Sequence, residues 1–232
     1  MILNMAAGKP IQSTCRTARR ILLVDDHPLI REGLAEVLGR EADLVVCGEA
    51  EGRHQALELI PTTQPELAIV DLALKDSNGL ELIKDIRARF PKVLVLVVSM
   101  HDEELHAERA LRAGASGYLT KAEATSRVVQ AVRKVLAGEV YLSDRAANSL
   151  LSRVAGRSGE ASGGSVESLC DRELEVYELI GHGLSTSQIA RQLHIGVSTV
   201  ETYRARIKVK LNLQDAAELL QHAIRWHLSR RV

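Results

Sequence analysis

The feature that most constrains the fold is a regular alternation, over residues 21–138, between short apolar runs and stretches with helical spacing. The apolar runs lie at 21–24, 44–47, 67–70, 93–98 and 117–119, and the helical stretches lie at 28–39, 52–60, 79–89, 103–113 and 124–137. Runs that are apolar at every position, rather than at every second one, are typical of parallel strands covered on both faces. The pattern predicts an α/β fold with a doubly wound, five-stranded parallel sheet.

The C-terminal part of the chain has a different pattern, with four short helical segments and no strand signal over 169–228. Ser185 with Gln188, and Ser198 with Glu201, match the capping box, in which a side chain and a backbone amide bond each other at a helix start. The two helices are expected at 186–193 and 199–211. This spacing predicts a small all-α helix-turn-helix domain, although such helix pairs also occur in proteins that do not bind DNA.

The two patterns divide the 232-residue chain into four parts. Gly and Ser dominate 156–168, a composition that is typical of a flexible linker. The first residues carry Lys and Arg but no apolar core of signal-peptide length, which indicates a loose leader. The expected boundaries are 1–19 for the leader, 20–138 for the α/β domain, 139–167 for the linker and 168–232 for the helix-turn-helix domain.

Composition and charge exclude several classes of protein. The longest apolar run, 93–98, is far shorter than the roughly 20 residues of a membrane helix, so no membrane span is expected. The three cysteines are odd in number and far apart, which fits neither a disulfide framework nor a zinc site and favours the cytoplasm. Residues 21–140 hold 14 Lys and Arg against 20 Asp and Glu, whereas 204–210 forms a basic cluster that either faces phosphates or is a solvated helix face.

Three carboxylates are expected to meet at one edge of the sheet. Asp25 and Asp26 directly follow one apolar strand and Asp71 follows another, and open α/β sheets bind their ligands at the carboxyl ends of their strands. Carboxylates this close repel one another, so either a pKa rises or a cation neutralises them. Oxygen ligands with room for water favour Mg²⁺. The alternative is that each Asp only starts a turn.

Several motifs, taken together, resemble a known family. Residues 21–28 (Ile-Leu-Leu-Val-Asp-Asp-His-Pro), Val70-Asp71-Leu72 with Gly79 eight residues after Asp71, Val98-Ser99, and 117–121 (Gly-Tyr-Leu-Thr-Lys) match the receiver-domain pattern in order and spacing. Residues 169–173, 183–190 and 198–204 resemble the DNA-binding domain of LuxR-type regulators. The whole chain is similar to NarL/FixJ-type response regulators, which implies a flavodoxin-like receiver followed by a helix-turn-helix domain.

The resemblance implies a role for each acidic residue. Asp71 would be the phosphoacceptor, its carboxylate attacking phosphorus to give an aspartyl phosphate. Asp26 would bind Mg²⁺ directly, Asp25 would hold the ion through water, and the Ala73 carbonyl would complete the protein ligands. Lys121 would supply a fixed positive charge for the phosphoryl oxygens.

Ser99 and Tyr118 would transmit the modification. The resemblance implies that Ser99 hydrogen-bonds the new phosphoryl group and that the Tyr118 ring follows it inward, which changes the surface of the last helix-strand-helix unit. Without the acidic site, the two residues would be interpreted as a strand-end serine and a half-buried tyrosine.

The helix at 199–211 is expected to enter the major groove. Val200, Tyr203, Ile207 and Leu211 recur at helical spacing and are expected in the core. The candidate DNA-binding residues are Ser198, Thr199, Glu201, Thr202, Arg204, Ala205, Arg206 and Lys208.

The last helix, near 214–228, has more apolar surface than a three-helix core needs. In the family this helix pairs two DNA-binding domains, so Leu220, Ala223 and Ile224 are candidate dimerisation residues. A dimer would read two half-sites about 34 Å apart. The alternative is packing within its own domain.

Four positions depart from the family pattern. Leu74 and Lys75 stand where receivers usually have Met-Pro, and Lys75 frees the backbone and adds a charge near the pocket. Glu201 stands where many members have Lys, and we interpret it as a helix cap rather than a base contact. Cys170 replaces the Thr that usually caps the first helix of the DNA-binding domain.

The resemblance implies a cytoplasmic two-component response regulator. A sensor histidine kinase would phosphorylate Asp71, and the phosphorylated homodimer would bind double-stranded DNA at an inverted repeat, with RNA polymerase as a further candidate partner. The chain would not be an enzyme beyond self-phosphorylation from phosphodonors and slow autodephosphorylation. Two alternatives stay open: a phosphorylation-independent DNA-binding regulator, and a Mg²⁺-dependent aspartate-nucleophile phosphatase, which is disfavoured because Ala73 stands where that class has an Asp general acid.

Overall fold

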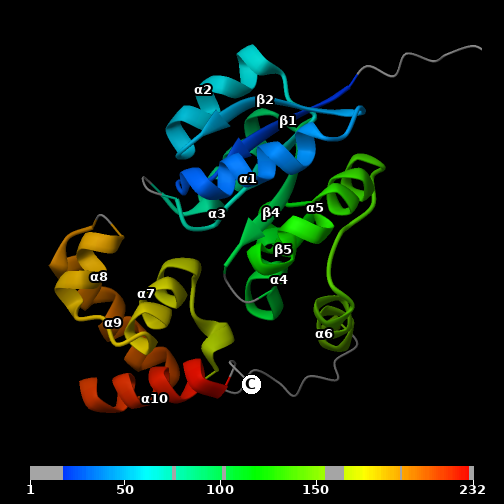
Figure 1. The fold of residues 1–232 in the computed structure, drawn as a ribbon. Helices are drawn as coiled ribbons and strands as arrows, with labels where there is room; N and C mark the ends of the chain where they lie inside the picture. The colour runs from blue at the N-terminus through cyan, green and yellow to red at the C-terminus, as the bar shows by residue number, and fades with distance from the viewer. Residues whose placement is uncertain (1–17, 75–76, 101–102, 155–164, 194, 230–232) are drawn as a thin grey trace, which may run out of the picture.

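The computed structural model describes residues 18–74, 77–100, 103–154, 165–193 and 195–229 (Figure 1). Almost all of the predicted leader lies outside these residues, as do Lys75, Asp76 and most of the Gly/Ser-rich stretch.

A five-stranded parallel sheet forms the centre of the N-terminal domain, with the strand order β2-β1-β3-β4-β5. The strands are β1 (Arg19–Val24), β2 (Leu44–Ala50), β3 (Leu67–Val70), β4 (Leu94–Ser99) and β5 (Gly117–Thr120). The predicted sheet is confirmed. Two strands run further than their apolar runs: β1 begins at Arg19, and β2 continues to Ala50 because Gly48 and Glu49 maintain the parallel pairing with β1.

Five helices cover the two faces of this sheet (Figure 1). They are α1 (Pro28–Gly39), α2 (Arg53–Thr63), α3 (Gly79–Arg89), α4 (Glu103–Ala113) and α5 (Lys121–Leu136). Side chains of α1 and α5 share one core cluster, and those of α2, α3 and α4 share the other. Within β1, Ile21 and Leu23 point to the first cluster and Leu22 and Val24 to the second, which explains why the strand is apolar at every position.

The predicted linker contains a helix, α6 (Asp144–Val154), which packs against α4. Just before it, Tyr141 extends the sheet beside β5: the Tyr118 N–H donates to the Tyr141 carbonyl at 2.8 Å, and the Tyr141 N–H donates to the Ser116 carbonyl at 3.1 Å. The Ser143 N–H donates to Glu103 Oε1 at 2.8 Å. The segment after α5 is therefore attached to the N-terminal domain.

The C-terminal domain is all-helical, as predicted. Its elements are the short 3₁₀ helix η1 (Val166–Ser168), α7 (Asp171–Gly181), α8 (Thr186–Gln192), α9 (Val197–Leu211) and α10 (Ala216–Ser229). Val166, which is 7% exposed, packs into the core of this domain. Among the described residues, no helix combines the length and apolarity that a membrane crossing requires.

Candidate functional site

The three predicted carboxylates meet at the carboxyl edge of the sheet. Asp25 follows β1 and Asp71 follows β3, and each is only 3% exposed. One ligand atom from each of Asp25, Asp26, His27 and Asp71 lies within 4.8 Å of the others. The neighbouring strands β1 and β3 place these residues side by side, because their parallel register ends at Val24 and Val70.

Lys121 neutralises much of this acidic pocket. As the first residue of α5 it directly follows β5, and its Nζ lies 2.6 Å from Asp25 Oδ2 and 2.6 Å from Asp71 Oδ2. Its side chain is 4% exposed. Burial lowers the pKa of Lys121, but Asp71 and Asp25 outweigh it, so the lysine pKa lies above its ordinary value. The ammonium group is therefore held charged inside the pocket.

Lys121 does not fully compensate the negative charge that is buried at Asp71. Burial raises the pKa of Asp71, Lys121 lowers it and Asp25 raises it again, and the pKa remains above its ordinary value. Asp71 Oδ1 is buried and has no hydrogen-bond partner. An acceptor oxygen of this kind, beside two further carboxylates, fits a hard divalent cation such as Mg²⁺. Ala73, whose carbonyl was predicted as a ligand, is exposed and pairs with Asn78 in an antiparallel bridge.

Two residues beside the pocket were not predicted as site residues. His27 Nδ1 lies 2.7 Å from Asp26 Oδ1, and the His27 N–H donates to Asp25 Oδ1 at 2.9 Å. Arg31 Nη1 donates to the Asp25 carbonyl at 2.5 Å. The available sequence signals were the position of His27 directly after the acidic pair and that of Arg31 one helical turn later.

Ser99 and Tyr118 lie next to Asp71 and are both fully buried. Hydrogen bonding with the Ser99 side chain acts to lower the pKa of both Asp71 and Tyr118. Burial nevertheless raises the pKa of Tyr118 well above its ordinary value, with Asp71 and Glu178 adding to the effect. Ser99 therefore lies between the predicted phosphoacceptor and the tyrosine.

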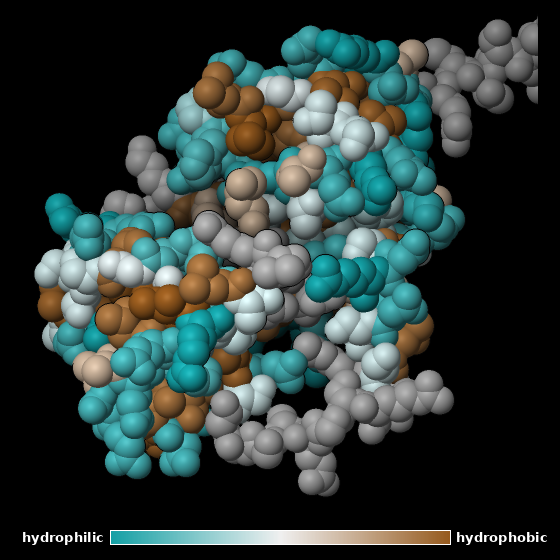
Figure 2. Space-filling model, turned by 60° about the horizontal axis from the view of Figure 1, so that its bottom comes forward, coloured by the Kyte–Doolittle hydropathy of each residue, from teal (hydrophilic) through white to brown (hydrophobic). Residues whose placement is uncertain are grey.

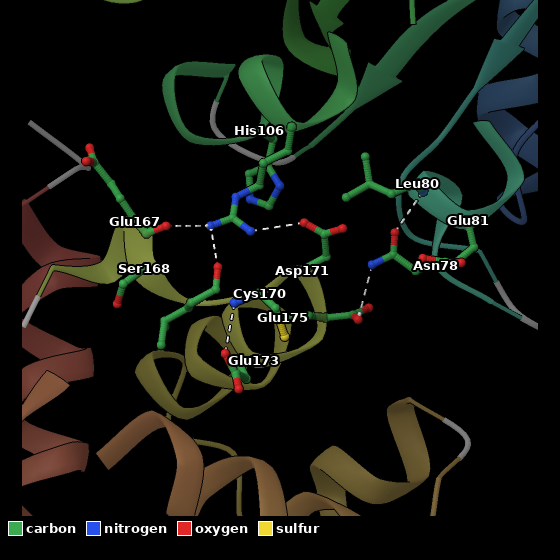
Figure 3. A network of polar contacts seen from close by, with 12 residues as sticks. Asn78, Leu80, Glu81, His106, Glu167, Ser168, Cys170, Asp171, Glu173 and Glu175 are labelled. Atoms are coloured by element: carbon green, nitrogen blue, oxygen red, sulfur yellow. Dashed lines mark hydrogen bonds and ion pairs between the residues drawn. The ribbon is translucent and has the colours of Figure 1, made fainter. Parts of the chain in front are cut away.

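The two domains contact each other through α4 and α7, which Figure 3 shows from close by. Arg109 Nη1 lies 3.0 Å from Asp171 Oδ1, and Arg109 Nη2 donates to the Leu169 carbonyl at 2.7 Å. His106 Nε2 lies 2.9 Å from Glu178 Oε1, and both side chains are largely buried. The sequence analysis did not predict this interface, because charged residues on helices are usually solvated.

A third contact joins the same helix α7 to the start of α3. Asn78 Nδ2 donates to Glu175 Oε2 at 3.3 Å, and Lys84 Nζ lies 3.5 Å from Asp171 Oδ2. Asn78 also caps α3, because its Oδ1 accepts the Leu80 N–H at 2.8 Å. The interface thus reaches the segment that follows Asp71.

The helix-turn-helix is formed by α8 and α9. The predicted capping box at Ser185 is confirmed: the Ser185 N–H donates to Gln188 Oε1 at 2.8 Å, and the Gln188 N–H donates to Ser185 Oγ at 3.4 Å. His194, in the predicted turn, lies outside the described residues. Of the predicted core positions, Val200, Ile207 and Leu211 are buried, and Tyr203 packs partly against them.

The predicted cap at the start of α9 was wrong. Gly196 is the N-cap and α9 begins at Val197, so Ser198 lies in its first turn. Glu201 instead accepts a hydrogen bond from the Thr186 hydroxyl at 2.9 Å and lies 3.8 Å from Arg204. The extended backbone of Gly196 lets the helix start earlier, which frees Glu201 to join α9 to α8.

The predicted DNA face of α9 is accessible in the docked arrangement of the domains. Exposed members are Ser198, Thr199, Glu201, Thr202, Ala205 and Arg206, whereas Arg204 and Lys208 are partly buried. The receiver-facing helix of this domain is α7, not α9.

The predicted dimerisation residues on α10 differ in accessibility. Leu220 is 40% exposed and Ile224 is partly buried, but Ala223 is fully buried and its carbonyl lies where a side chain at Gly181 would sit. Ala223 therefore packs within its own domain.

Figure 2 shows apolar surface gathered on the C-terminal domain, in the lower left of the view.

Two family models match the chain. The response regulator receiver domain matches residues 21–133, and the luxR family of bacterial regulatory proteins matches residues 167–223.

Curated relatives align over nearly the whole chain. The transcriptional activator protein ExaE of Pseudomonas putida is 40% identical over 88% of this chain and 95% of its own length. The DNA-binding transcriptional activator DevR/DosR of Mycobacterium tuberculosis is 33% identical over 84% of this chain and 89% of its own. A structure of RcsB from Salmonella enterica serovar Typhimurium, bound to a promoter with the phosphomimetic BeF₃⁻, shares the fold, with a TM-score of 0.64 and 23% identity over 89% of this chain and 98% of that one.

Proposed function

Because the chain belongs to the NarL/FixJ family of two-component response regulators, we propose that phosphorylation of Asp71 by a partner histidine kinase controls its binding to DNA. The observation that carries the proposal is the pocket itself. It places a buried carboxylate with a raised pKa and an unbonded oxygen beside two further acids, and a lysine contacts it at 2.6 Å.

The pocket can support attack on phosphorus. A carboxylate oxygen of Asp71 would form the new P–O bond while the donor's bond to phosphorus breaks, and the leaving group would depart with that electron pair. Lys121 would neutralise the phosphoryl oxygens, and the Ser99 hydroxyl would donate to one of them. Asp25, Asp26, Asp71 and the Ala73 carbonyl would hold Mg²⁺, which supplies further neutralisation of charge when bound. The chain would act chemically only on itself, by accepting and slowly losing phosphate.

The downstream step would be DNA binding by paired C-terminal domains. Of the predicted dimerisation residues on α10, Leu220 and Ile224 are accessible enough to take part in pairing. Helix α9 would present its exposed face to an inverted repeat. Transcription would be regulated in the cytoplasm, with RNA polymerase as a further partner. We propose 20–138 as the receiver, 139–167 as a connector that includes α6, and 168–232 as the DNA-binding domain.

The experiment that tests this function is a DNA-binding titration with and without phosphate transfer. Acetyl phosphate with Mg²⁺ is expected to change the affinity of the wild-type protein for duplex DNA, and to leave the affinity of the Asp71→Asn variant unchanged. An equal effect on both proteins, or on neither, would refute phosphate control. The second outcome would favour the phosphorylation-independent regulator.

Arg206→Ala is expected to weaken binding to random-sequence duplex DNA about tenfold and to lower the slope of log affinity against log salt by about one, since one phosphate contact is lost. Fluorescence anisotropy over a series of KCl concentrations measures both. Arg112→Ala, which removes an exposed arginine of the receiver, is the control and should change neither. If the two variants behave alike, α9 does not contact the backbone through Arg206.

Arg109→Ala is expected to separate the two domains, because it removes the contacts to Asp171 and to the Leu169 carbonyl. The radius of gyration from small-angle X-ray scattering should increase. Arg112→Ala, one turn further along α4 and 79% exposed, is the matched control. An unchanged radius of gyration for Arg109→Ala would mean that other contacts hold the docked arrangement.

A further inference from the structure

We infer that the DNA-binding domain helps to position the Mg²⁺-binding loop of the receiver, and that Glu175 is the positioning residue through which it acts. The described residues of this loop are 71–74, which include Ala73, and 77–78. This inference rests on the proposed function, because it concerns the same metal pocket. It assigns a role in that pocket to a residue of the other domain.

The loop is closed at its base by backbone contacts. The Gly79 N–H donates to the Leu72 carbonyl at 2.8 Å, and Ala73 and Asn78 form an antiparallel bridge. The position of Asn78 therefore determines the position of Ala73, whose carbonyl is the proposed metal ligand. Asn78 is 7% exposed, so its side chain has little room for another arrangement.

The side-chain amide of Asn78 makes one hydrogen bond within its own domain and one to the other domain (Figure 3). Its Oδ1 accepts the Leu80 N–H at the start of α3, and its Nδ2 donates to Glu175 Oε2 of α7 at 3.3 Å. Arg172 Nη1 donates to the same Glu175 oxygen at 2.9 Å and fixes it in place. The chain of contacts Arg172, Glu175, Asn78 and Ala73 thus runs from the DNA-binding domain to the metal loop.

A second contact between the domains lies near Tyr118. Glu178 of α7 lies 2.9 Å from His106 on α4, and its negative charge contributes, after burial and Asp71, to the raised pKa of Tyr118. This contact holds α7, and with it Glu175, against the N-terminal domain. Because Asn78 and its bridge then hold the Ala73 carbonyl in place, docking should raise the affinity for Mg²⁺. By linkage, Mg²⁺ should strengthen docking by the same factor.

The test is a Mg²⁺ titration of the full-length protein, followed by the amide chemical shifts of the receiver in NMR spectra. Glu175→Ala is expected to weaken Mg²⁺ binding roughly threefold to tenfold, the effect of one hydrogen bond. Glu175→Gln keeps an oxygen that can accept from Asn78 and should stay within about twofold of the wild type, because a neutral acceptor weakens this hydrogen bond less than its removal does. Arg109→Ala, which detaches the domain, should match Glu175→Ala.

Glu58→Ala is the control, since Glu58 lies on α2 and pairs with His54 away from the interface. Equal Mg²⁺ affinities for the wild type, Glu175→Ala and Glu175→Gln would overturn the inference while leaving the proposed function intact. An equal loss in both Glu175 variants would overturn the hydrogen-bond role and leave charge alone as the cause. A wild type that does not bind Mg²⁺ at all would overturn the proposed metal site as well.

Discussion

Asp71→Asn is expected to abolish phosphate uptake from acetyl phosphate, the largest effect that we predict for any single substitution. The amide is not a nucleophile towards phosphorus, and the neighbouring carboxylates of Asp25 and Asp26 are expected to be engaged with the metal. Intact-mass spectrometry should show one added phosphoryl group on the wild-type protein when the reaction contains Mg²⁺. It should show none when EDTA removes the Mg²⁺ before acetyl phosphate is added. The mutant should show no addition under either condition.

Asp144→Asn is the matched control, because Asp144 is exposed on α6 and far along the chain from the pocket. It should be labelled as fully as the wild type. Labelling of Asp71→Asn would contradict the assignment and move the acceptor to another carboxylate. Absence of labelling in the wild type would remove the phosphate switch and leave a DNA-binding protein that another signal controls.

Gly79→Ala is expected to cause the second largest effect, a loss of folding stability together with a loss of phosphate uptake. A Cβ at this position would lie 2.1 Å from the Asp71 carbonyl oxygen and 2.7 Å from the Leu72 Cα. These are backbone atoms of the strand end that carries Asp71, so relief of the clash must move the phosphoacceptor. Overpacking of this kind costs about 1–3 kcal/mol or more. Urea unfolding measures the stability and intact mass measures the uptake.

Gly33→Ala is a control that is expected to raise the folding stability rather than lower it. Gly33 lies inside α1, and a Cβ there would meet nothing within 4 Å. Alanine should therefore stabilise the helix by about 0.5–1 kcal/mol and leave phosphate uptake unchanged. If Gly79→Ala unfolds at the same urea concentration as the wild type and is phosphorylated equally, the segment after β3 is more adaptable than its packing implies.

The sheet and its acidic edge could be predicted from sequence because both depend on local pattern. β3 is apolar on both faces, which identifies it as a central strand. The register of β1 and β3 then brings Asp25 and Asp71 together, independently of the conformation of the loops. The helix bounds of α1, α3 and α4 followed from the same spacing. Ser185 and Gln188 likewise identified the start of α8 because a capping box is a contact between near neighbours.

The features that could not be predicted depend on contacts between distant segments. The position of α6 depends on its packing against α4 and on the hydrogen bond between Ser143 and Glu103, which lie 40 residues apart in the chain. Ser198 matched a cap, but Gly196, two residues earlier, takes that role and α9 begins at Val197. Arg109 and Glu178 have the charges of solvated helix faces. Arg109 meets Asp171, and Glu178 meets His106, only because the two domains approach each other.

The attachment of Tyr141 beside β5 determines where the receiver can be excised. A fragment that ends at residue 138 would leave the Tyr118 N–H and the Ser116 carbonyl on an open edge strand, and such edges promote self-association. It would also remove the Tyr141 side chain, which is 7% exposed, from the core. A fragment extended to Val154 would keep this edge covered and retain α6 against α4. The folding unit of the receiver is thus longer than its five-stranded pattern alone would suggest.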